Sequence, residues 1–363
     1  MNPNYCSRIA LLALLLLGTV RLQGQDENST SHDSILGSAG EEFIQDHKKQ
    51  LNIKFEVSND INAYSVESGG EELFLKPNLE LRYALVFSYK FLSVRLGIRP
   101  AQSDLDLEKK GESDTFRLRV QALFDNWSHL IQYDYDRGYY LDNTLKFDPD
   151  AGAVKAQFPY MTTHLFFGSS IYKFNPNYSI RSIESQTEIQ VKSSGSLVLG
   201  LNYGYYSLFG MDRVLKPGED LSFRDPFSEF NGFNIAPLAG YYYTFVFKKY
   251  WFANAFVIPQ FGIDIYKSTL FSEGQEFKKN RTEFFAAVDY GFGGGYNGEK
   301  FFFGAQLRNR RSSAKLDADK IQIQPQKNTF SVYLGYRFKA PKTVAKPVDL
   351  IEEKVPILKD NRG

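Results

Sequence analysis

The segment NTFSVYLGYRF, residues 328–338, alternates apolar or aromatic side chains with small or polar ones. A period of two is typical of a β-strand with one apolar face. The apolar pattern ends on an aromatic residue, although 363 − 338 = 25 residues follow in a tail rich in lysine and proline. The residues on the apolar face are Phe330, Val332, Leu334, Tyr336 and Phe338.

Upstream of this segment, the same alternation recurs in short runs that are separated by turn-forming residues. None of the runs has the spacing of a convincing amphipathic helix, so the chain is predicted to be all-β, as a sandwich or a barrel. The runs lie at 51–57, 78–90, 91–99, 115–124, 129–136, 159–174, 178–192, 195–208, 234–247, 250–266, 281–297, 300–311 and 328–338.

The lengths of the connections favour a barrel over a sandwich. Tight turns largely alternate with long polar loops, as in outer-membrane barrels, whereas a soluble sandwich has no reason for such alternation. The tight connections are 89–93, 124–127, 174–179, 247–251 and 296–300, and the long ones are 100–114, 142–158, 209–232, 267–280 and 312–327.

The strand number follows from this alternation. Bacterial barrels have an even number of strands, so the two runs within 178–208 are taken as one long or kinked strand, or as one spanning strand with a short excursion. The sequence therefore predicts a transmembrane, antiparallel up-and-down β-barrel of about twelve strands, with ten or fourteen as the alternatives. The barrel is expected to occupy residues 49–338.

The segments that flank the barrel indicate export. Residues 1–25 have the basic start, apolar run and small-residue end of a signal peptide, with a retained N-terminal anchor as the alternative. A flexible polar lead-in is expected at 26–48 and a periplasmic tail at 339–363. The predicted location is the cell outer membrane.

Composition excludes several classes of function for the mature chain. The only cysteine is Cys6, so disulfides, thiolate metal sites and a cysteine nucleophile are absent once residues 1–25 are removed. That removal takes away Arg8 and Arg21 and leaves 41 basic against 42 acidic residues. No nucleic-acid partner is indicated by this balance.

The polar faces of the strands carry charges of both signs, which suits the interior of a narrow barrel where charges must pair. The alternative is an ordinary solvated face. Asp134 and Asp136 are expected to pair with Arg117 and Arg119 across a hairpin, and a cation site or an acid pair is the alternative. The candidate lumen charge network comprises Arg82, Arg95, Arg117, Arg119, Asp134, Asp136, Asp264, Glu283, Asp289, Arg308 and Arg310.

Aromatic residues near the strand ends are expected to form girdles at the two membrane interfaces, with an ordinary hydrophobic core as the alternative. They are Trp127, Tyr139, Tyr140, Tyr241, Tyr242, Tyr243, Tyr250 and Trp251. The closing YLGYRF resembles the C-terminal signal that the outer-membrane assembly machinery reads, which makes Tyr336 and Phe338 the candidate assembly signal. The expected partners are therefore outer-membrane lipid and the barrel assembly machinery.

The histidines, serines and glycines of the sequence do not form a catalytic pattern. Ser128 and His129 are neighbours on a strand and point to opposite faces, and Ser170 is about 20 Å from His164 along its strand. The glycine-rich segment 291–298 is not followed by a helix, so it is not expected to bind phosphate. No catalytic residue, cofactor or metal site is predicted, and the protein is not expected to be an enzyme.

Several segments resemble an uncharacterised outer-membrane family, the domain-of-unknown-function family numbered 4421: SYKFLSVRLGI (88–98), KSSGSLVLGL (192–201), YNGEKFFFGAQL (296–307) and YLGYRF. The resemblance covers roughly residues 40–338. It implies a barrel in the Gram-negative outer membrane and brings no assigned activity or catalytic residues.

Three functions remain open from the sequence. The first is passage or binding of a small solute or ion through the charged lumen. The second is a non-conducting barrel scaffold whose outer loops or periplasmic tail bind partners. The third and weakest is an outer-membrane lipid-modifying enzyme.

Overall fold

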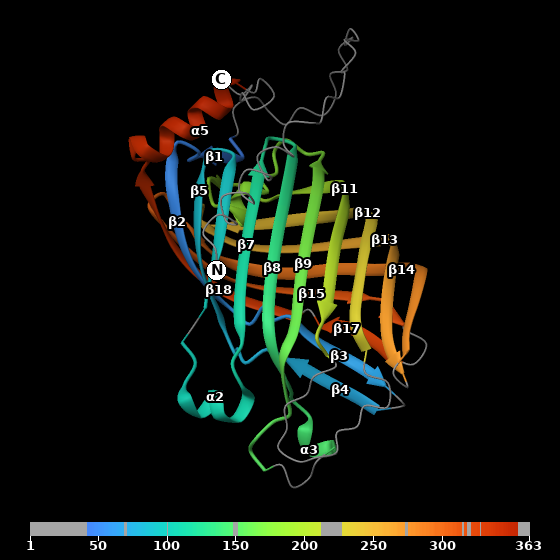
Figure 1. Ribbon diagram of the computed structural model, residues 1–363. Coiled ribbons are helices and arrows are strands. Elements are labelled where there is room, and N and C mark those ends of the chain that lie inside the picture. Colours follow the sequence, from blue (N-terminus) through green and yellow to red (C-terminus); the bar gives the residue numbers. More distant parts are fainter. Residues whose placement is uncertain are drawn as a thin grey trace. The chain divides into compact units, whose positions relative to one another are not determined.

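The computed structural model describes residues 42–68, 71–99, 101–147, 152–211, 227–272, 275–313, 316–317, 321–326 and 328–354. Within these residues, twelve antiparallel strands pair in a closed ring (Figure 1). The predicted fold class and the strand number are confirmed. The predicted signal peptide, residues 26–41 of the lead-in and residues 355–363 of the tail lie outside the described residues.

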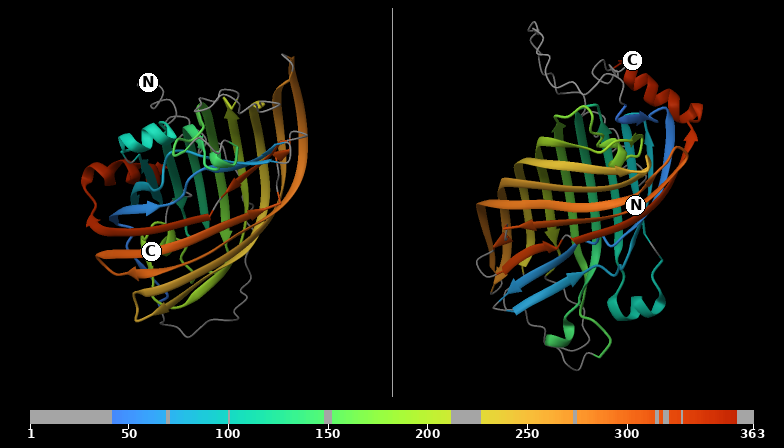
Figure 2. Two further views of the ribbon diagram at one scale, coloured as in Figure 1. Left: turned by 90° about the horizontal axis from the view of Figure 1, so that it is seen from below. Right: turned by 180° about the vertical axis from the view of Figure 1, so that it is seen from behind.

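Each strand of the ring pairs with the next one along the chain, and the ring closes where β18 pairs with β2, with Leu334 opposite Phe55. Figure 2 shows the ring from two other directions. Its strands are β2 (Gln50–Ser58), β5 (Arg82–Tyr89), β6 (Leu92–Ile98), β7 (Asp114–Leu123), β8 (Trp127–Leu141), β9 (Gln157–Lys173), β11 (Ser194–Phe209), β12 (Phe227–Phe247), β13 (Trp251–Ser272), β14 (Gln275–Asn297), β15 (Phe301–Ser312) and β18 (Asn328–Lys339).

The two ends of the barrel differ in their connections. At the tight-turn end, short turns join β5 to β6, β7 to β8, β12 to β13 and β14 to β15, and Lys90, Lys248 and Lys249 adopt positive φ there. The connections of the long-loop end are longer, with one exception. Residues 267–280 were expected to form a loop, but β13 continues to Ser272 and β14 begins at Gln275, and these two residues pair. A polar sequence is compatible with strand pairing once a hairpin extends beyond an apolar zone.

The long-loop end carries additional elements: β3 (Ala63–Ser68), β4 (Glu71–Lys76), β16 (Leu316–Asp317), β17 (Ile321–Gln326), α2 (Asp104–Lys110) and α3 (Thr144–Phe147). The four additional strands pair in the order β16, β17, β3 and β4. They join the ring where β4 pairs with β8, with Leu75 opposite Leu141. A buried apolar cluster lies beneath them and includes Tyr64, Leu73, Tyr139, Phe158 and Phe230. Tyr139 and Tyr140 are therefore buried, and the expectation that they belong to an interfacial girdle is wrong.

The ambiguous region 178–208 contains one spanning strand and a short excursion, which was one of the two alternatives. Residues 194–209 form β11, and residues 175–193, here called the lumen insert, precede it. The insert contains α4 (Arg181–Glu184) and β10 (Glu188–Gln190), and β10 pairs with β1 (Ile44–Asp46). The expected flexible lead-in thus contains an ordered strand, because β10 supplies backbone partners for it.

The C-terminal tail contains a helix that the sequence analysis did not predict, α5 (Lys342–Lys354), shown in red (Figure 1). Val348 packs with Leu51, Tyr89 and Phe91 at the tight-turn end, although Pro347 lies within the helix. Lys90 pairs with Asp349 at 2.7 Å and with Glu352. Burial alone would lower the pKa of Lys90, but its hydrogen bonds to these two carboxylates raise it above its ordinary value. Among the described residues, no helix is both long and apolar enough to span a membrane.

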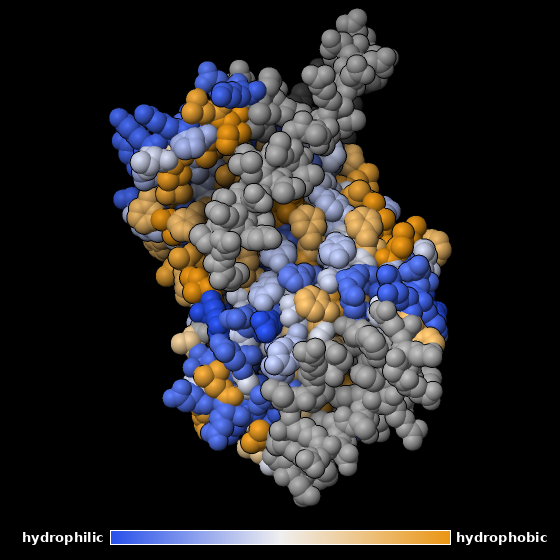
Figure 3. All heavy atoms as spheres, viewed as in Figure 1, coloured by the Kyte–Doolittle hydropathy of each residue, from blue (hydrophilic) through white to orange (hydrophobic). Residues whose placement is uncertain are grey.

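The outer surface of the strands is apolar. On the face seen in Figure 3, hydrophobic residues gather over the strands, and hydrophilic residues gather around α2. Exposed aromatic and aliphatic side chains recur at alternate positions, and Phe284 is 83% exposed. Such an extended apolar surface is typical of a barrel that faces lipid. Its members include Phe55, Phe87, Leu96, Phe116, Leu197, Leu199, Phe233, Val257, Phe261, Phe284, Phe292, Phe330 and Leu334.

Aromatic residues gather at the tight-turn end of this surface. Trp127 packs against Tyr172 with ring centroids 5.1 Å apart, and Trp251 packs against Tyr296 at 5.4 Å. Tyr336 and Phe338 also contact each other, at 4.7 Å, and both are more than 40% exposed. Rings with one polar atom favour the headgroup level of a bilayer, so this arrangement matches one of the predicted girdles.

Candidate functional site

The lumen insert lies inside the barrel at the tight-turn end. Tyr178, Thr187 and Ile189 are fully buried, although the insert is a connection between two strands. It contacts β2, β7, β12, β14, β15 and β18 through hydrogen bonds or ion pairs, so its contacts extend around the ring. A connection normally runs over the surface because buried backbone groups need partners. Here the barrel wall supplies those partners.

Polar side chains of the wall bind the backbone of the insert. Asn52 donates to the carbonyl oxygen of Ser185 at 3.0 Å, and Asn297 donates to those of Ser182 and Glu188, each at 3.2 Å. Arg337 donates through Nη2 to the carbonyl oxygen of Gln186 at 2.7 Å. These contacts satisfy carbonyl groups that would otherwise be buried without partners.

Ion pairs hold the insert as well. Arg181 pairs with Glu188 at 2.9 Å, and its Nη2 donates to the carbonyl oxygen of Leu123 at 2.6 Å. Glu184 of α4 accepts from Arg308 of β15 at 2.5 Å. Burial alone would raise the pKa of Glu184, but the guanidinium of Arg308 lowers that pKa below its ordinary value. Glu184 is therefore held as a carboxylate inside the barrel.

A second group of charges lies on the lumen side of β5, β7 and β8. Arg117 pairs with Asp134 at 2.6 Å and also with Asp60, and Arg82 pairs with Asp136 at 2.9 Å. Asn62 donates to Asp136 at 2.6 Å. Arg82, Arg117, Asp134 and Asp136 are all at most 2% exposed, so these are buried, closely paired charges.

The expected pairing of the two arginines with the two aspartates is only half right. Arg117 lies directly opposite Asp134 in the β7–β8 register, but Arg119 lies opposite Gln132 and donates to it at 2.7 Å. Asp136 is reached by Arg82 from β5 instead. The β7–β8 register determines these partners, because it sets Asp134 opposite Arg117 and Gln132 opposite Arg119.

The remaining predicted network residues lie on other parts of the wall. Asp264 accepts from Tyr206 at 2.8 Å, and Glu283 accepts from Tyr266 at 2.7 Å. Arg310 pairs with Asp289 at 3.5 Å. The eleven predicted charges therefore fall into separate groups rather than one network.

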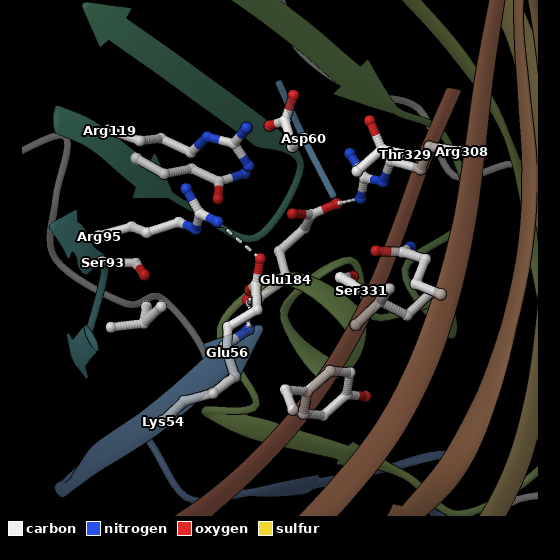
Figure 4. A pocket seen from close by; sticks show the side chains of 15 residues that line it. Lys54, Glu56, Asp60, Ser93, Arg95, Arg119, Glu184, Arg308, Thr329 and Ser331 are labelled. Atoms are coloured by element: carbon white, nitrogen blue, oxygen red, sulfur yellow. Dashed lines mark hydrogen bonds and ion pairs between the residues drawn. The ribbon is translucent and has the colours of Figure 1, made fainter. Parts of the chain in front are cut away.

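A cavity of about 110 Å³ lies between the lumen insert and the second charge group (Figure 4). Arg95, Arg119 and Arg308 of the predicted network line it. The network prediction omitted four charged residues of its wall, which are Lys54, Glu56, Asp60 and Glu184. Alternation along 51–57 already put Lys54 and Glu56 on the polar face, but nothing in the sequence indicated that the segment with Glu184 folds inward.

One serine–histidine pair is present that the sequence analysis did not identify. His129 Nδ1 lies 2.9 Å from Ser170 Oγ, because these two residues are opposite each other in the β8–β9 register. His129 stacks on the exposed Trp127, so the pair belongs to the outer surface of the barrel. Among the described residues, no carboxylate orients His129, and a triad needs such a group.

The acidic side chains of the lumen do not form a metal site among the described residues. Among the residues that the structure describes, no group of three or more His, Cys, Asp or Glu side chains could hold a metal ion. Asp134 and Asp136, the pair for which a cation site was the alternative, each accept hydrogen bonds from basic or amide groups.

Solved structures with a similar chain course are outer-membrane proteins. The outer membrane protease OmpT from Escherichia coli is 9% identical, with 81% of this chain and 98% of that chain covered and a TM-score of 0.38. The translocator domain of the autotransporter NalP from Neisseria meningitidis is 10% identical, with 80% and 89% covered and a TM-score of 0.38. Ail, the attachment invasion locus protein of Yersinia pestis, is 12% identical, with 80% and 98% covered and a TM-score of 0.19.

These likenesses are too distant to say anything about activity, because the identities are near 10% and the TM-scores are below 0.5. No curated protein matches the sequence. A family model does match, over residues 32–338, and so spans the entire barrel. The chain belongs to the family that this model describes, the Domain of unknown function (DUF4421) family.

Proposed function

We propose that this protein is a non-conducting barrel of the outer membrane whose lumen is closed by its own chain. The single observation that carries the proposal is the lumen insert, which is buried inside the ring and bonded to six strands besides the two that flank it. An open pore needs an aqueous path through both ends of the barrel, and the insert fills the tight-turn end.

The outer surface supports the location. Its exposed apolar side chains form the kind of band that outer-membrane barrels present to lipid, and the aromatic residues at the tight-turn end match an interfacial girdle. We assign the tight-turn end, with α5, to the periplasm, because short turns lie on that side of such barrels.

The role that remains for a closed barrel is that of a scaffold. The long-loop end carries the strands β3, β4, β16 and β17 beyond the ring, and the opposite end carries α5. We place the partner-binding surfaces on these elements, because they extend from the barrel at both ends. In this proposal the barrel performs no catalysis.

The test of the proposal is single-channel recording of the refolded mature protein in a planar bilayer. A heat-induced gel shift on the same sample serves as the control for folding. We expect a folded barrel that gives no discrete conductance steps. Discrete, ion-selective steps from the intact protein would overturn the proposal.

The terminal strand provides a second prediction, on assembly. Phe338→Ala should lower the membrane-inserted fraction several-fold, because it removes the exposed aromatic residue at the end of β18 that the assembly machinery is proposed to read. Phe330→Ala is a matched control, since Phe330 lies on the same strand and face and is equally exposed, at 44%. Cell fractionation with the gel shift measures both variants. Equal insertion of the two variants would contradict the assigned signal.

A further inference from the structure

The cavity between the lumen insert and the barrel wall has more positive than negative charge on its lining. Four basic residues line it, Lys54, Arg95, Arg119 and Arg308, against three acidic ones, Glu56, Asp60 and Glu184. One of the three acids, Asp60, is also paired with Arg117, which lies outside the lining. The wall of the cavity therefore has an excess of cationic groups.

Arg119 contributes most clearly to that excess. Its Nε donates to Gln132 at 2.7 Å, and among the described residues no carboxylate oxygen lies within 4.0 Å of its guanidinium. Arg95 lies directly opposite it in the β6–β7 register. Like charges in directly opposed positions destabilise a sheet. Two guanidinium groups thus occupy neighbouring positions beside the cavity, and of the two only Arg95 has a direct ion pair with a carboxylate of the described residues, Glu56.

Some guanidinium donors of the residues that line the cavity have no acceptor among the described residues. Arg95 is only 5% exposed, and its Nη2 donates to Glu56 at 2.8 Å, but its Nε and Nη1 are buried and have no hydrogen-bond partner in the described part of the chain. Arg308 donates through Nη2 to Glu184, and its Nε is likewise buried with no partner among the residues that the structure describes. Buried donors in native proteins are nearly always satisfied, by protein, water or a bound ion.

Figure 4 shows how these side chains lie. Arg95 and Arg119 extend side by side from one wall, and Arg308 comes from the opposite wall, with Glu56 and Glu184 between them. The cavity volume is about 110 Å³, which is several times the roughly 30 Å³ that one water molecule occupies in the liquid. A small oxyanion fits that space, with room for accompanying water.

We propose that the cavity is a binding site for a small anion with two or more oxygen atoms, held by Arg95 and Arg119 with Arg308 opposite. Guanidinium groups bind carboxylate and phosphate through paired N–H···O bonds, for which their planar fork is suited. Such a ligand accepts from the unpartnered Nε and Nη1 of Arg95 and separates the two like charges. The site goes beyond the closed-barrel proposal and does not depend on conductance.

The test is thermal unfolding of the refolded protein, followed by tryptophan fluorescence, in phosphate, succinate or chloride at one ionic strength. We expect phosphate or succinate to raise the unfolding temperature more than chloride, and the better of the two identifies the class of oxyanion. Arg119→Gln should weaken binding of that anion roughly tenfold or more, because a fork donor is lost. Equal shifts in all three salts would overturn the proposal.

Two further variants keep the test decisive. Arg137→Gln removes the same charge from an exposed position and should leave the shift unchanged. Arg119→Lys keeps the charge but loses the fork, so it should bind more weakly than the intact protein even if the glutamine variant fails to fold. An anion effect of the same size in the intact protein and in a folded Arg119 variant would show that the stabilisation does not come from this cavity. Conductance by the intact protein would overturn the closed-barrel proposal but not the anion site.

Discussion

Deletion of the lumen insert should convert a silent barrel into a conducting one. The change removes residues 176–193 and joins Asn175 to Ser194 through two glycines. These residues already lie together, since the Asn175 side chain donates to Ser194 Oγ at 3.1 Å and to the carbonyl oxygen of Gly195 at 2.7 Å. The turn that results resembles the other connections of the tight-turn end, so the ring is expected to close.

The physical basis is the width of the ring. Eight strands enclose an interior that side chains just fill, and barrels of 16–18 strands leave an aqueous channel. A ring of twelve strands lies between these, and here the insert occupies the additional space. Without it, Asn52, Asn297 and Arg337 face water instead of insert carbonyls.

The measurement is single-channel recording, with the gel shift as the folding control. Asn177→Ala, a change within the insert at an exposed side chain, is the matched control and should stay silent. Discrete steps from the deletion variant alone are the expected result. A folded deletion variant that remains silent would place the seal at the long-loop end, in the apolar cluster around Phe158 and Phe230.

Replacement of Arg117 by alanine should produce the largest loss of stability of any single charge removal in the barrel. Its guanidinium is 1% exposed and pairs with both Asp60 and Asp134. Removing one partner of a buried ion pair leaves an uncompensated buried charge, at a cost of about 3–5 kcal/mol. Asp134 would be left beside Gln132 and Asn62, which do not carry a positive charge.

Urea unfolding of the refolded protein in lipid vesicles measures this loss. Arg99→Ala is the matched control, because Arg99 also pairs with two carboxylates, Glu112 and Asp114, but at an exposed site. Exposed pairs contribute about 0–1 kcal/mol, so that variant should unfold almost like the intact protein. Similar losses in the two variants would contradict the view that the buried pairing stabilises the barrel.

The elements that could be predicted from the sequence are strands whose two faces meet different surroundings, because the side chains on those faces then differ in polarity. Alternation in the segment 328–338 predicted β18, because outward positions meet apolar surroundings and inward positions do not. The same rule failed at 267–280, where the strands β13 and β14 continue as polar residues and the pattern no longer marks a boundary. Beyond the apolar zone both faces of a strand can be polar, so the sequence no longer alternates with a period of two.

The sequence by itself determined the class of the protein, the ring of about twelve strands and which side chains of a strand share a face, because strand alternation assigns each strand residue to one of two faces. Tertiary structure alone decided which lumen charges meet. Arg82 reaches Asp136 across intervening strands, and Glu184 reaches Arg308 through an insert that folds inward. Such pairs join residues far apart in the chain, and their contact depends on strand register and on the course of the insert, neither of which leaves a periodic signal.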